Sequence, residues 1–423
     1  MPQTNSNIET GKEGKGKGIL VVGGGISGIT TAIEAAETGY WVILVEQLPY
    51  LGGRAIEMNR YFPKLCPPYC GMEINFKRIK QNQRISYFTS TRIKAISGTE
   101  GDFQVKLETR PQMVNNNCTL CGDCSDVCPV EISDCFNYNM NKTKAIYLPH
   151  EMAFPERYTI DSEHCEKSKC GKCVDVCGYN AIDLTKEAES FELEVGSIVF
   201  ATGWEPYNAE KIEDLKFGIH QDIITNMMME RMLAANGPSQ GNIFCPSDGR
   251  NPEKIAFVQC AGSRDEKHLP YCSGVCCSAS IKQALTIVQQ NTEIEVKIYY
   301  IDLRLAGRNE DFLRKAEEHP RIELIKGKVA LVNIDNNKPG FVAEDIMSGR
   351  KITSEVDILV LATGIVPNIS YREIIKYNKE GFILDTELEK GIYSAGCAKK
   401  PMDISSSVKD ATGTALKAIQ SVR

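Results

Sequence analysis

The cysteines carry the clearest chemistry in this sequence, which contains 17 of them. Eight cysteines form two compact runs, the first spaced C-x2-C-x2-C-x3-C-P and the second C-x4-C-x2-C-x3-C. Three closely spaced thiolates can bind three irons of a cubane, so the fourth ligand must come from elsewhere in the chain. The first run is Cys118, Cys121, Cys124 and Cys128, and the second is Cys165, Cys170, Cys173 and Cys177.

This spacing is typical of bacterial ferredoxins with two [4Fe–4S] clusters, in which the last cysteine of each run binds the other cluster. One cluster is therefore predicted on Cys118, Cys121, Cys124 and Cys177, and the other on Cys165, Cys170, Cys173 and Cys128. Zinc is the alternative, but zinc sites use two pairs of ligands rather than a triplet plus one. A disulfide scaffold is disfavoured because such scaffolds belong to short secreted chains. The leftover Cys135 is predicted to be a buried thiol.

A third group of thiols follows the predicted strand KIAFVQCAGSRD and precedes a predicted amphipathic helix, SASIKQALTIVQQ. It consists of Cys260, Cys272, Cys276 and Cys277. Two interpretations stand side by side: a third metal centre of unusual ligation, or reduced thiols around a degraded nucleotide site. Cys66 and Cys70 flank two prolines in LCPPYC, and they could be redox-active, bind metal or be inert buried thiols.

A glycine-rich turn near the start of the chain predicts a dinucleotide site. The apolar run 19–22 leads into Gly23, Gly25 and Gly28, spaced G-x-G-x-x-G; a helix-like segment follows, and then a second apolar run ends at Glu46. These glycines permit the tight turn, the approach of a pyrophosphate and the packing of helix on strand. Glu46 is placed to accept from a ribose hydroxyl, so this ribose should carry no phosphate. The alternative is a plain glycine-rich surface turn.

Later segments add to this predicted site. Gly52-Gly53-Arg54 could lie near the pyrophosphate or form a surface loop, and two Ala-Thr-Gly sequences end at Gly203 and Gly364. Cys397 follows a strand ending in Ser-Ala-Gly, and a helix is expected to begin near residues 405–407. The residues expected to bind the dinucleotide are Gly23, Gly25, Ile26, Ser27, Gly28, Glu46, Gly53, Arg54, Ala201, Thr202, Gly203, Gly364, Gly396, Cys397, Asp403 and Ile404.

Composition bounds the class of protein. With 423 residues, 42% of them apolar, the chain can form two or three domains. Its net charge of −6 argues against binding nucleic acid or anionic membrane surfaces. No window has the roughly 18 apolar residues of a membrane span, so a cytoplasmic protein is expected, attached to the inner membrane only through partner subunits.

The expected domains follow from the order of these motifs. Residues 211–250 are expected to be helical, with a methionine cluster in the core. The expected divisions are a disordered tail (1–17), a dinucleotide-binding domain in three parts (18–114, 187–250 and 367–423), an inserted ferredoxin-like domain (115–186) and a second Rossmann-like domain with extra cysteines (251–366).

The motifs together resemble the α/β fold of thioredoxin-reductase-like FAD proteins, with two dinucleotide-binding domains and an inserted ferredoxin-like domain holding two [4Fe–4S] clusters. In disulfide-reductase flavoproteins an Asp occupies the position of Cys397 and bonds the ribityl chain, so that contact is in doubt here, and Asp403 and the helix N-terminus remain to meet the flavin. Over nearly the whole chain, the sequence resembles the flavin-containing A subunits of heterodisulfide reductases. The motifs that carry this resemblance are GGGISG, GGR, the CP-terminated cysteine run, QCAGSRD…CSGVCC and AGC…P-x-D.

The length of the sequence and the segment YFPKLCPPYCGMEINFKRIK are similar to the A subunits of quinone-interacting membrane-bound oxidoreductase (Qmo) complexes of sulfate reducers. This resemblance implies that the chain binds FAD and [4Fe–4S] clusters. It also implies two partner subunits, one a second flavin/iron–sulfur protein and the other a membrane haem/iron–sulfur protein. It also implies electron exchange between the menaquinone pool and adenylylsulfate reductase in sulfate respiration.

Three functions are weighed. The favoured one is an electron-transfer subunit in which FAD converts two-electron into one-electron transfer and the clusters conduct. Its variant is a heterodisulfide-reductase-type subunit that couples hydrogenase, formate or ferredoxin to a thiol/disulfide partner. The second is a stand-alone NAD(P)H-dependent disulfide reductase using Cys66/Cys70 or Cys276/Cys277, which the missing second G-x-G-x-x-G disfavours. The third is a scaffold with structural clusters.

Overall fold

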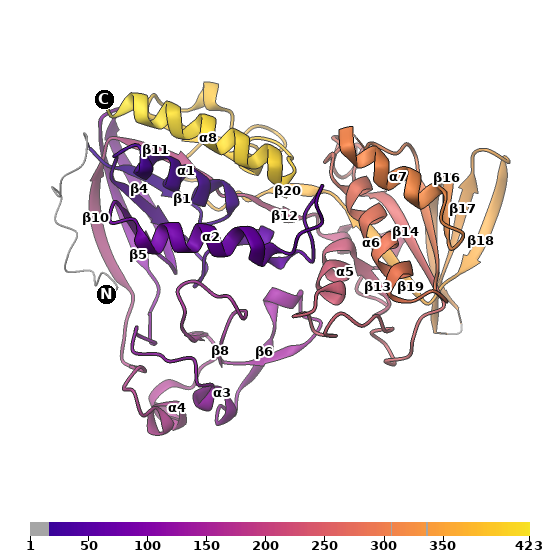
Figure 1. Cartoon of the computed structure of the whole chain (residues 1–423), viewed down its shortest axis with the longest axis horizontal. Coiled ribbons are helices and arrows are strands. Elements are labelled where there is room, and N and C mark those ends of the chain that lie inside the picture. Colours follow the sequence, from indigo (N-terminus) through magenta and orange to yellow (C-terminus); the bar gives the residue numbers. More distant parts are fainter. Residues whose placement is uncertain (1–16, 306, 336) are drawn as a thin grey trace.

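The computed structural model describes residues 17–305, 307–335 and 337–423. Two α/β units lie side by side, and a smaller insert hangs below the first unit (Figure 1). The predicted tail lies outside the described residues except for Lys17, which forms an ion pair with Asp102. Every helix in the described ranges is too short or too polar to cross a membrane.

The first unit is built on a five-stranded parallel sheet. Side chains of its central strand alternate between two cores: Ile19 and Val21 face the helices, whereas Leu20 and Val22 face a second, antiparallel sheet of three strands. The parallel sheet and its helices are β1 (Ile19–Val22), α1 (Ile26–Glu37), β2 (Val42–Val45), α2 (Pro68–Gln81), β3 (Ile85–Phe88), β11 (Ser197–Phe200), β21 (Ile392–Ser394) and α8 (Ile404–Ser421), in the strand order β21-β11-β1-β2-β3. The antiparallel sheet is β4 (Thr91–Thr99), β5 (Asp102–Thr109) and β10 (Glu189–Val195), in the order β10-β5-β4.

The insert lies between β5 and β10, which pair antiparallel with Thr109 opposite Glu189. Its two ends therefore leave the sheet on neighbouring strands. It has its own small core, which includes Met113, Ile146 and Ile160. Its elements are α3 (Asp123–Asp126), β6 (Glu131–Ser133), η3 (Cys135–Asn137), β7 (Lys142–Lys144), β8 (Ile146–Tyr147), β9 (Thr159–Ile160), η4 (Lys167–Lys169) and α4 (Lys172–Val176).

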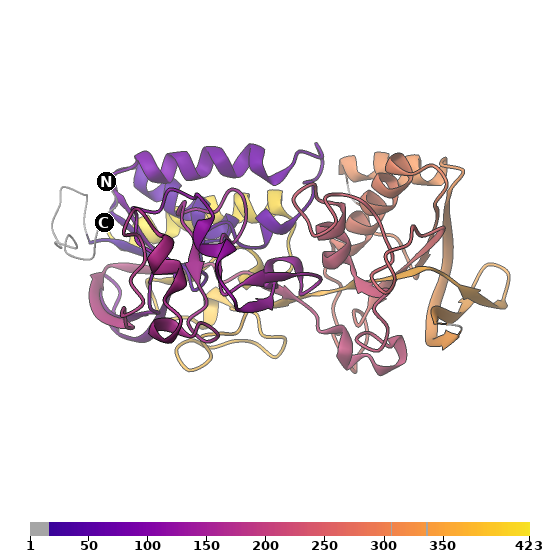
Figure 2. The same cartoon turned by 90° about the horizontal axis from the view of Figure 1, so that it is seen from below.

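The second unit has a seven-stranded sheet with the order β13-β19-β14-β15-β16-β17-β18. The chain enters this unit through β12 (Trp204–Pro206) and leaves it through β20 (Ile365–Pro367), and these two strands pair antiparallel between the units. Figure 2 shows the same two-part arrangement from below. Its elements are β13 (Ile223–Thr225), α5 (Asn226–Leu233), β14 (Lys254–Ala261), α6 (Cys276–Gln290), β15 (Glu295–Tyr300), α7 (Glu310–Glu317), β16 (Ile322–Asp335), β17 (Lys338–Asp345), β18 (Arg350–Glu355) and β19 (Ile358–Thr363).

The prediction of a helical segment over 211–250 is wrong in extent, because the α-helix there is confined to α5. The helix ends because Ala234 has an extended conformation, with φ of −78° and ψ of 136°. The chain then folds back tightly, since a Cβ at Gly237 would lie 1.7 Å from the carbonyl oxygen of Arg231. The expected methionine core is confirmed, since Met227, Met229 and Met232 are buried.

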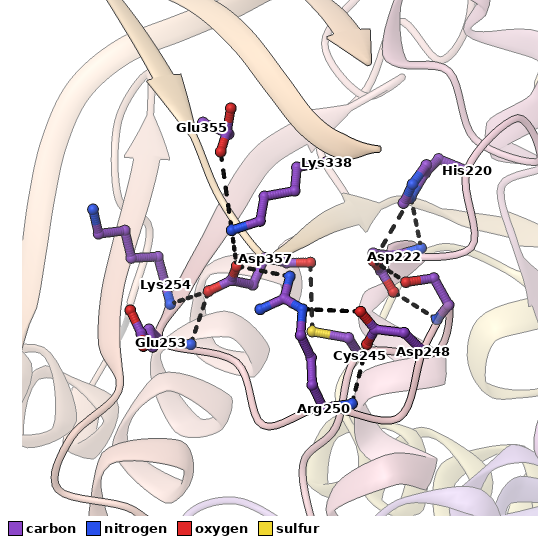
Figure 3. Close-up of polar contacts among 11 residues, drawn as sticks. His220, Asp222, Cys245, Asp248, Arg250, Glu253, Lys254, Lys338, Glu355 and Asp357 are labelled. Carbon is purple, nitrogen blue, oxygen red and sulfur yellow. Dashed lines mark hydrogen bonds and ion pairs between the residues drawn. The ribbon is translucent and has the colours of Figure 1, made fainter. Parts of the chain in front are cut away.

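The sheet of the second unit is secured at its N-terminal edge by the carboxylate of Asp357, the residue before β19 (Figure 3). The backbone N–H groups of Glu253 and Lys254 donate to it at 2.8 and 2.9 Å. Lys338 and Arg250 form ion pairs with its other oxygen at 3.0 and 2.9 Å. Burial alone would raise the pKa of Asp357, but these donors outweigh it and lower the pKa to about 2.

Replacing Asp357 by Asn should therefore lower the free energy of unfolding by about 2 kcal/mol at neutral pH, because a charged acceptor of several hydrogen bonds is lost. A depressed folded-state pKa stabilises the protein above the unfolded value of about 3.9, and that contribution disappears as the pH falls toward the folded value. Urea unfolding at several pH values should show the difference shrinking between about pH 4 and pH 2. A difference that stays constant over this range would contradict the assignment.

Candidate functional site

The glycine turn between β1 and α1 has the geometry of a phosphate cradle. Gly23 has φ of +109°, and a Cβ there would lie 2.3 Å from the carbonyl oxygen of Ala201. A Cβ on Gly28 would lie 1.8 Å from the carbonyl oxygen of Gly23, so α1 packs on the turn only with glycine at that position. Gly25, in contrast, faces open space with Gly53 Cα at 3.8 Å as the nearest atom. An anion can thus approach the N-terminus of α1 at Gly25.

Glu46 stands directly after β2 and is buried. Its carboxylate accepts from the backbone N–H of Gly24 at 2.6 Å and from that of Leu48 at 2.8 Å. Burial raises the pKa of Glu46, while these backbone donors act in the opposite direction. The side chain is therefore held at the edge of the glycine turn, where the ribose of a dinucleotide would lie.

A cavity of about 780 Å³ opens beside this turn and extends between the two units. Its volume lies within the range of cofactor and small-molecule sites, roughly 300–1,000 Å³. Its walls come from the glycine turn, the 3₁₀ turn η2 (Gly53–Glu57), the loop after β11, the start of α8 and the start of α6. Sequence segments far apart in the chain thus meet around one space.

Most of the predicted dinucleotide residues line this cavity. Gly28, Gly364 and Gly396 do not, because their backbones support the wall from behind. A Cβ on Gly364 would lie 2.3 Å from Ser263 Oγ, and one on Gly396 would lie 2.1 Å from Ser27 Oγ. The predicted residues in the lining are Gly23, Gly25, Ile26, Ser27, Glu46, Gly53, Arg54, Ala201, Thr202, Gly203, Cys397, Asp403 and Ile404.

Residues after β11 and at the start of α8 fit a polar cofactor. The Thr202 hydroxyl is buried and has no hydrogen-bond partner among the described residues. The Asp403 carboxylate accepts from the Ser406 N–H at 2.6 Å and so caps α8. Cys397 donates its thiol to the Met402 carbonyl oxygen at 3.4 Å. The wall of the cavity thus offers a ligand an unpaired hydroxyl and the N-terminus of an eighteen-residue helix.

A buried ion pair in the cavity wall was missed by sequence reasoning. Lys282 of α6 pairs with Glu230 of α5, and both side chains are almost fully buried. Gln283 donates to Glu230 at 2.8 Å, and Lys282 also donates to the Arg60 carbonyl oxygen at 3.0 Å. The pair joins helices of the second unit to the loop after η2 in the first unit. No sequence motif predicts this ion pair, because the two residues lie on separate helices and are far apart in the sequence.

The insert reaches the same cavity through the 3₁₀ turn η3. Cys135 is exposed and lines the cavity, so the prediction of a buried thiol is wrong. The reason is local: Asp134 caps η3 by accepting from the Phe136 N–H at 3.0 Å, and the turn buries the two residues after Cys135 instead. Tyr138 donates to Glu57 of the cavity wall at 2.6 Å.

Arg231 connects all three parts of the molecule at this point. Its guanidinium is fully buried and donates to Asn137 of the insert at 2.9 Å and to the Glu57 carbonyl oxygen of the first unit at 3.1 Å. It also lies 4.6 Å from the centroid of the Phe136 ring. The second unit, which carries Arg231 on α5, is thereby fixed to both of the others.

The thiols of the insert are only partly brought together. A second, small cavity is lined by Cys128 together with Cys165, Cys170 and Cys173, the set predicted for one cluster. Cys124 and Cys173 are buried in the small core of the insert, whereas Cys121 is exposed and Cys177 half-buried. Among the described residues, no three His, Cys, Asp or Glu side chains converge as they would on a single metal ion.

The third group of thiols gathers at the C-terminal end of β14 and the N-terminus of α6. Burial raises the pKa of the Cys276 thiol, and the neighbouring thiols of Cys277, Cys260 and Cys272 act in the same direction. Cys276 donates to the Thr363 carbonyl oxygen at 3.4 Å. The group lies beside the main cavity, because Gly274, Val275 and Ser278 of the same segment line it.

Cys66 and Cys70 lie apart from these groups. Cys66 is half-buried before α2, and Cys70 is exposed in its first turn. The expectation of burial is therefore wrong for Cys70, while the redox-active and metal-binding roles stay predictions.

Comparisons with known proteins define the class. Residues 18–114 match the protein family of FAD-dependent oxidoreductases. Thioredoxin reductase from Lactococcus lactis has the same fold, with a TM-score of 0.53, 14% identity, and coverage of 96% of this chain and 99% of that one. Bacillithiol disulfide reductase Bdr from Bacillus cereus also gives a TM-score of 0.53 at 11% identity, covering 96% and 98% of the two chains. The chain therefore has the α/β fold of thioredoxin-reductase-like flavoproteins, as the sequence predicted, and its residues 18–114 are similar to FAD-dependent oxidoreductases.

More specific relatives belong to heterodisulfide reductases. The chain is 34% identical over 416 residues to the A subunit of the H2:CoB-CoM heterodisulfide,ferredoxin reductase of Methanothermobacter thermautotrophicus. It is 34% identical over 421 residues to the iron-sulfur A subunit of the CoB–CoM heterodisulfide reductase of Methanocaldococcus jannaschii. Each match covers 94% of this chain but 63% of the relative. The predicted resemblance to these A subunits is thus confirmed at the level of homology, while the narrower Qmo resemblance stays a prediction.

Replacing Lys282 by Met should destabilise the protein strongly, because Glu230 would keep its buried charge without a counter-charge. The expected loss in the free energy of unfolding is about 3–5 kcal/mol. Urea unfolding of the flavin-free protein measures it without interference from a bound cofactor. The double variant E230Q/K282M should recover part of the loss, and a single variant as stable as the wild type would contradict the buried pair.

Proposed function

We propose that this chain is an FAD- and iron–sulfur-dependent electron-transfer subunit of a multisubunit redox complex. One observation supports this most: the main cavity touches both thiol-bearing regions of the chain. Cys135 of the insert lies in its lining, and so do Gly274, Val275 and Ser278, which flank Cys276 and Cys277 in the sequence. A cofactor in this cavity would stand between two routes for electrons.

FAD bound here would supply the conversion between two-electron and one-electron transfer. The glycine turn would hold its pyrophosphate at Gly25, and Glu46 would accept from the adenosine ribose. The N-terminus of α8, with Asp403 and Ile404, would meet the flavin end together with the unpaired Thr202 hydroxyl. The chain's role toward the cofactor is to bind it, orient it and shield it between the two units.

Two [4Fe–4S] clusters are proposed in the insert with crossed ligation. The cavity shared by Cys128 and the three cysteines of the second run supports the crossing, since Cys128 belongs to the first run by sequence. A third cluster is proposed on Cys260, Cys272, Cys276 and Cys277. Its support is the convergence of thiols from β14, from the loop after it and from α6.

A stand-alone NAD(P)H-dependent disulfide reductase is the competing function. In a Rossmann-like unit the turn after the first strand binds the pyrophosphate through glycines. Here that turn reads Cys260-Ala261-Gly262-Ser263-Arg264, and the four thiols gather beside it. The second unit therefore favours an electron-conducting centre over a nicotinamide nucleotide.

Iron analysis of anaerobically prepared protein tests this function. We expect about twelve irons per chain, eight from the insert and four from the third centre. The double variant C276S/C277S should lose about four irons and keep its flavin, because neither residue lines the main cavity. Cys245→Ser is the matched control, since Cys245 is buried in the same unit near Asp357. Eight irons in both the wild type and the C276S/C277S variant would mean that the third group consists of thiols that bind no cluster.

The narrower proposal concerns the partners. The segment YFPKLCPPYCGMEINFKRIK favours a Qmo-type complex, in which a membrane haem/iron–sulfur subunit is joined by a second flavin/iron–sulfur subunit. Electrons would then pass between menaquinone and adenylylsulfate reductase. The alternative is a heterodisulfide-reductase-type complex with a hydrogenase, formate or ferredoxin donor and a thiol/disulfide partner, in keeping with the relatives named above.

Purification of the intact complex from native membranes distinguishes these two assemblies. The Qmo-type proposal expects two partners, one a haem-containing membrane protein and the other a second flavin/iron–sulfur subunit, to accompany the chain through successive columns, identified by mass spectrometry. Recovery of the chain from the membrane-free fraction with a hydrogenase or formate dehydrogenase would favour the alternative and contradict the Qmo-type role.

A further inference from the structure

The loop that carries Cys260 has an unusual backbone. Cys260 and Arg264 have φ of +57° and +59°, a left-handed conformation that side-chain-bearing residues rarely adopt, and Gly262 between them has φ of +75°. The pairing of β14 with β19 shifts register between Val258 and Ala261. Unfavourable backbone of this kind persists where surrounding structure requires it, often at functional sites. Here it places both Cys260 and Arg264 beside the thiol group.

Two arginines of this region carry positive charge close to the thiols. Arg264 interacts electrostatically with Cys260, and Arg304 interacts in the same way with Cys272. The two arginines come from different segments, one after β14 and the other after β15. Each of these two less buried thiols therefore has a guanidinium group near it.

Asp302 holds both arginines in place. It forms an ion pair with Arg264, and the Arg304 Nε lies 3.1 Å from its second oxygen. Its carbonyl oxygen also accepts from the Cys277 thiol at 3.9 Å. The charged side chains facing the thiols are thus two guanidinium groups and one carboxylate, which leaves an excess of one positive charge.

We propose that Arg264 and Arg304 raise the reduction potential of the third iron–sulfur centre. This inference rests on the proposed function, because it requires a cluster on these thiols. Positive charge close to a cluster favours the reduced form, which carries one more negative charge. Asp302 acts as a positioning residue, since its carboxylate holds both guanidinium groups. The centre would then accept electrons readily from a flavin in the adjoining cavity.

The test is a redox titration followed by electron paramagnetic resonance, with R264Q and R304Q in the full-length holoprotein. The signal of the third centre is first assigned as the one lost in C276S/C277S. Each Gln variant should favour the oxidised form about tenfold more than the wild type, which for a one-electron couple is a fall of about 59 mV. R321Q is the matched control, because Arg321 carries the same charge at the opposite end of β15, where it pairs with Glu295.

The iron content separates the two ways in which this can fail. If the wild-type protein contains about eight irons, the third centre does not exist and the proposed role of the arginines is also wrong. About twelve irons and an unmoved potential in both Gln variants would overturn the role of the arginines alone. If R264Q loses iron, R304Q decides, because Arg304 is half-exposed outside the strained loop. An equal shift of the reduction potential in R321Q would mean that the loss of any positive charge has this effect, which would also overturn the proposal.

Discussion

The fully buried guanidinium of Arg231 is the contact on which the arrangement of the molecule depends. A charge in the interior is tolerated only when its hydrogen bonds are satisfied. Arg231 satisfies them with Asn137 of the insert, with Glu57 of the first unit and with Asn236 of its own unit. Moving any one of the three parts away would leave part of this charge unpaired. The relative position of the two α/β units and the insert is therefore set by a single side chain as much as by apolar packing.

The same principle operates at the cavity. Lys282 and Glu230 are charged, buried and dependent on one another, and the loop that contains Arg60 completes their coordination. The two units are also joined by the pairing of β12 with β20 and by aromatic pairs, Phe62 with Phe312 and Tyr271 with Phe382. Polar contacts are directional, so they fix the width of the cavity more closely than apolar packing would. A cofactor whose chemistry depends on its distance to two other centres requires such a fixed setting.

The sequence predicted the parts of this protein that rest on local patterns. Gly23, Gly25 and Glu46 belong to one β-α-β segment, and their places around one turn follow from spacing alone. The extent of α5 could not be predicted, because the chain turns extended at Ala234 and packs back on the helix at Gly237 only in the folded protein. The prediction that Cys135 is buried is wrong, because the exposure of its side chain depends on the 3₁₀ turn η3 that Asp134 caps rather than on hydrophobicity. The ion pair of Lys282 and the convergence of Arg264 and Arg304 on one carboxylate involve residues far apart in sequence, for which no periodicity exists.

The junction of the insert has a consequence for how such a protein could arise. Because Thr109 and Glu189 face each other on adjacent strands, the two ends of the insert lie about 5 Å apart, the spacing of neighbouring strands. A simple hairpin turn would close the same gap. An insertion at this point therefore lengthens a turn without disturbing the ladder of β5 and β10, and Asn137 and Tyr138 join it to the rest of the molecule through Arg231 and Glu57.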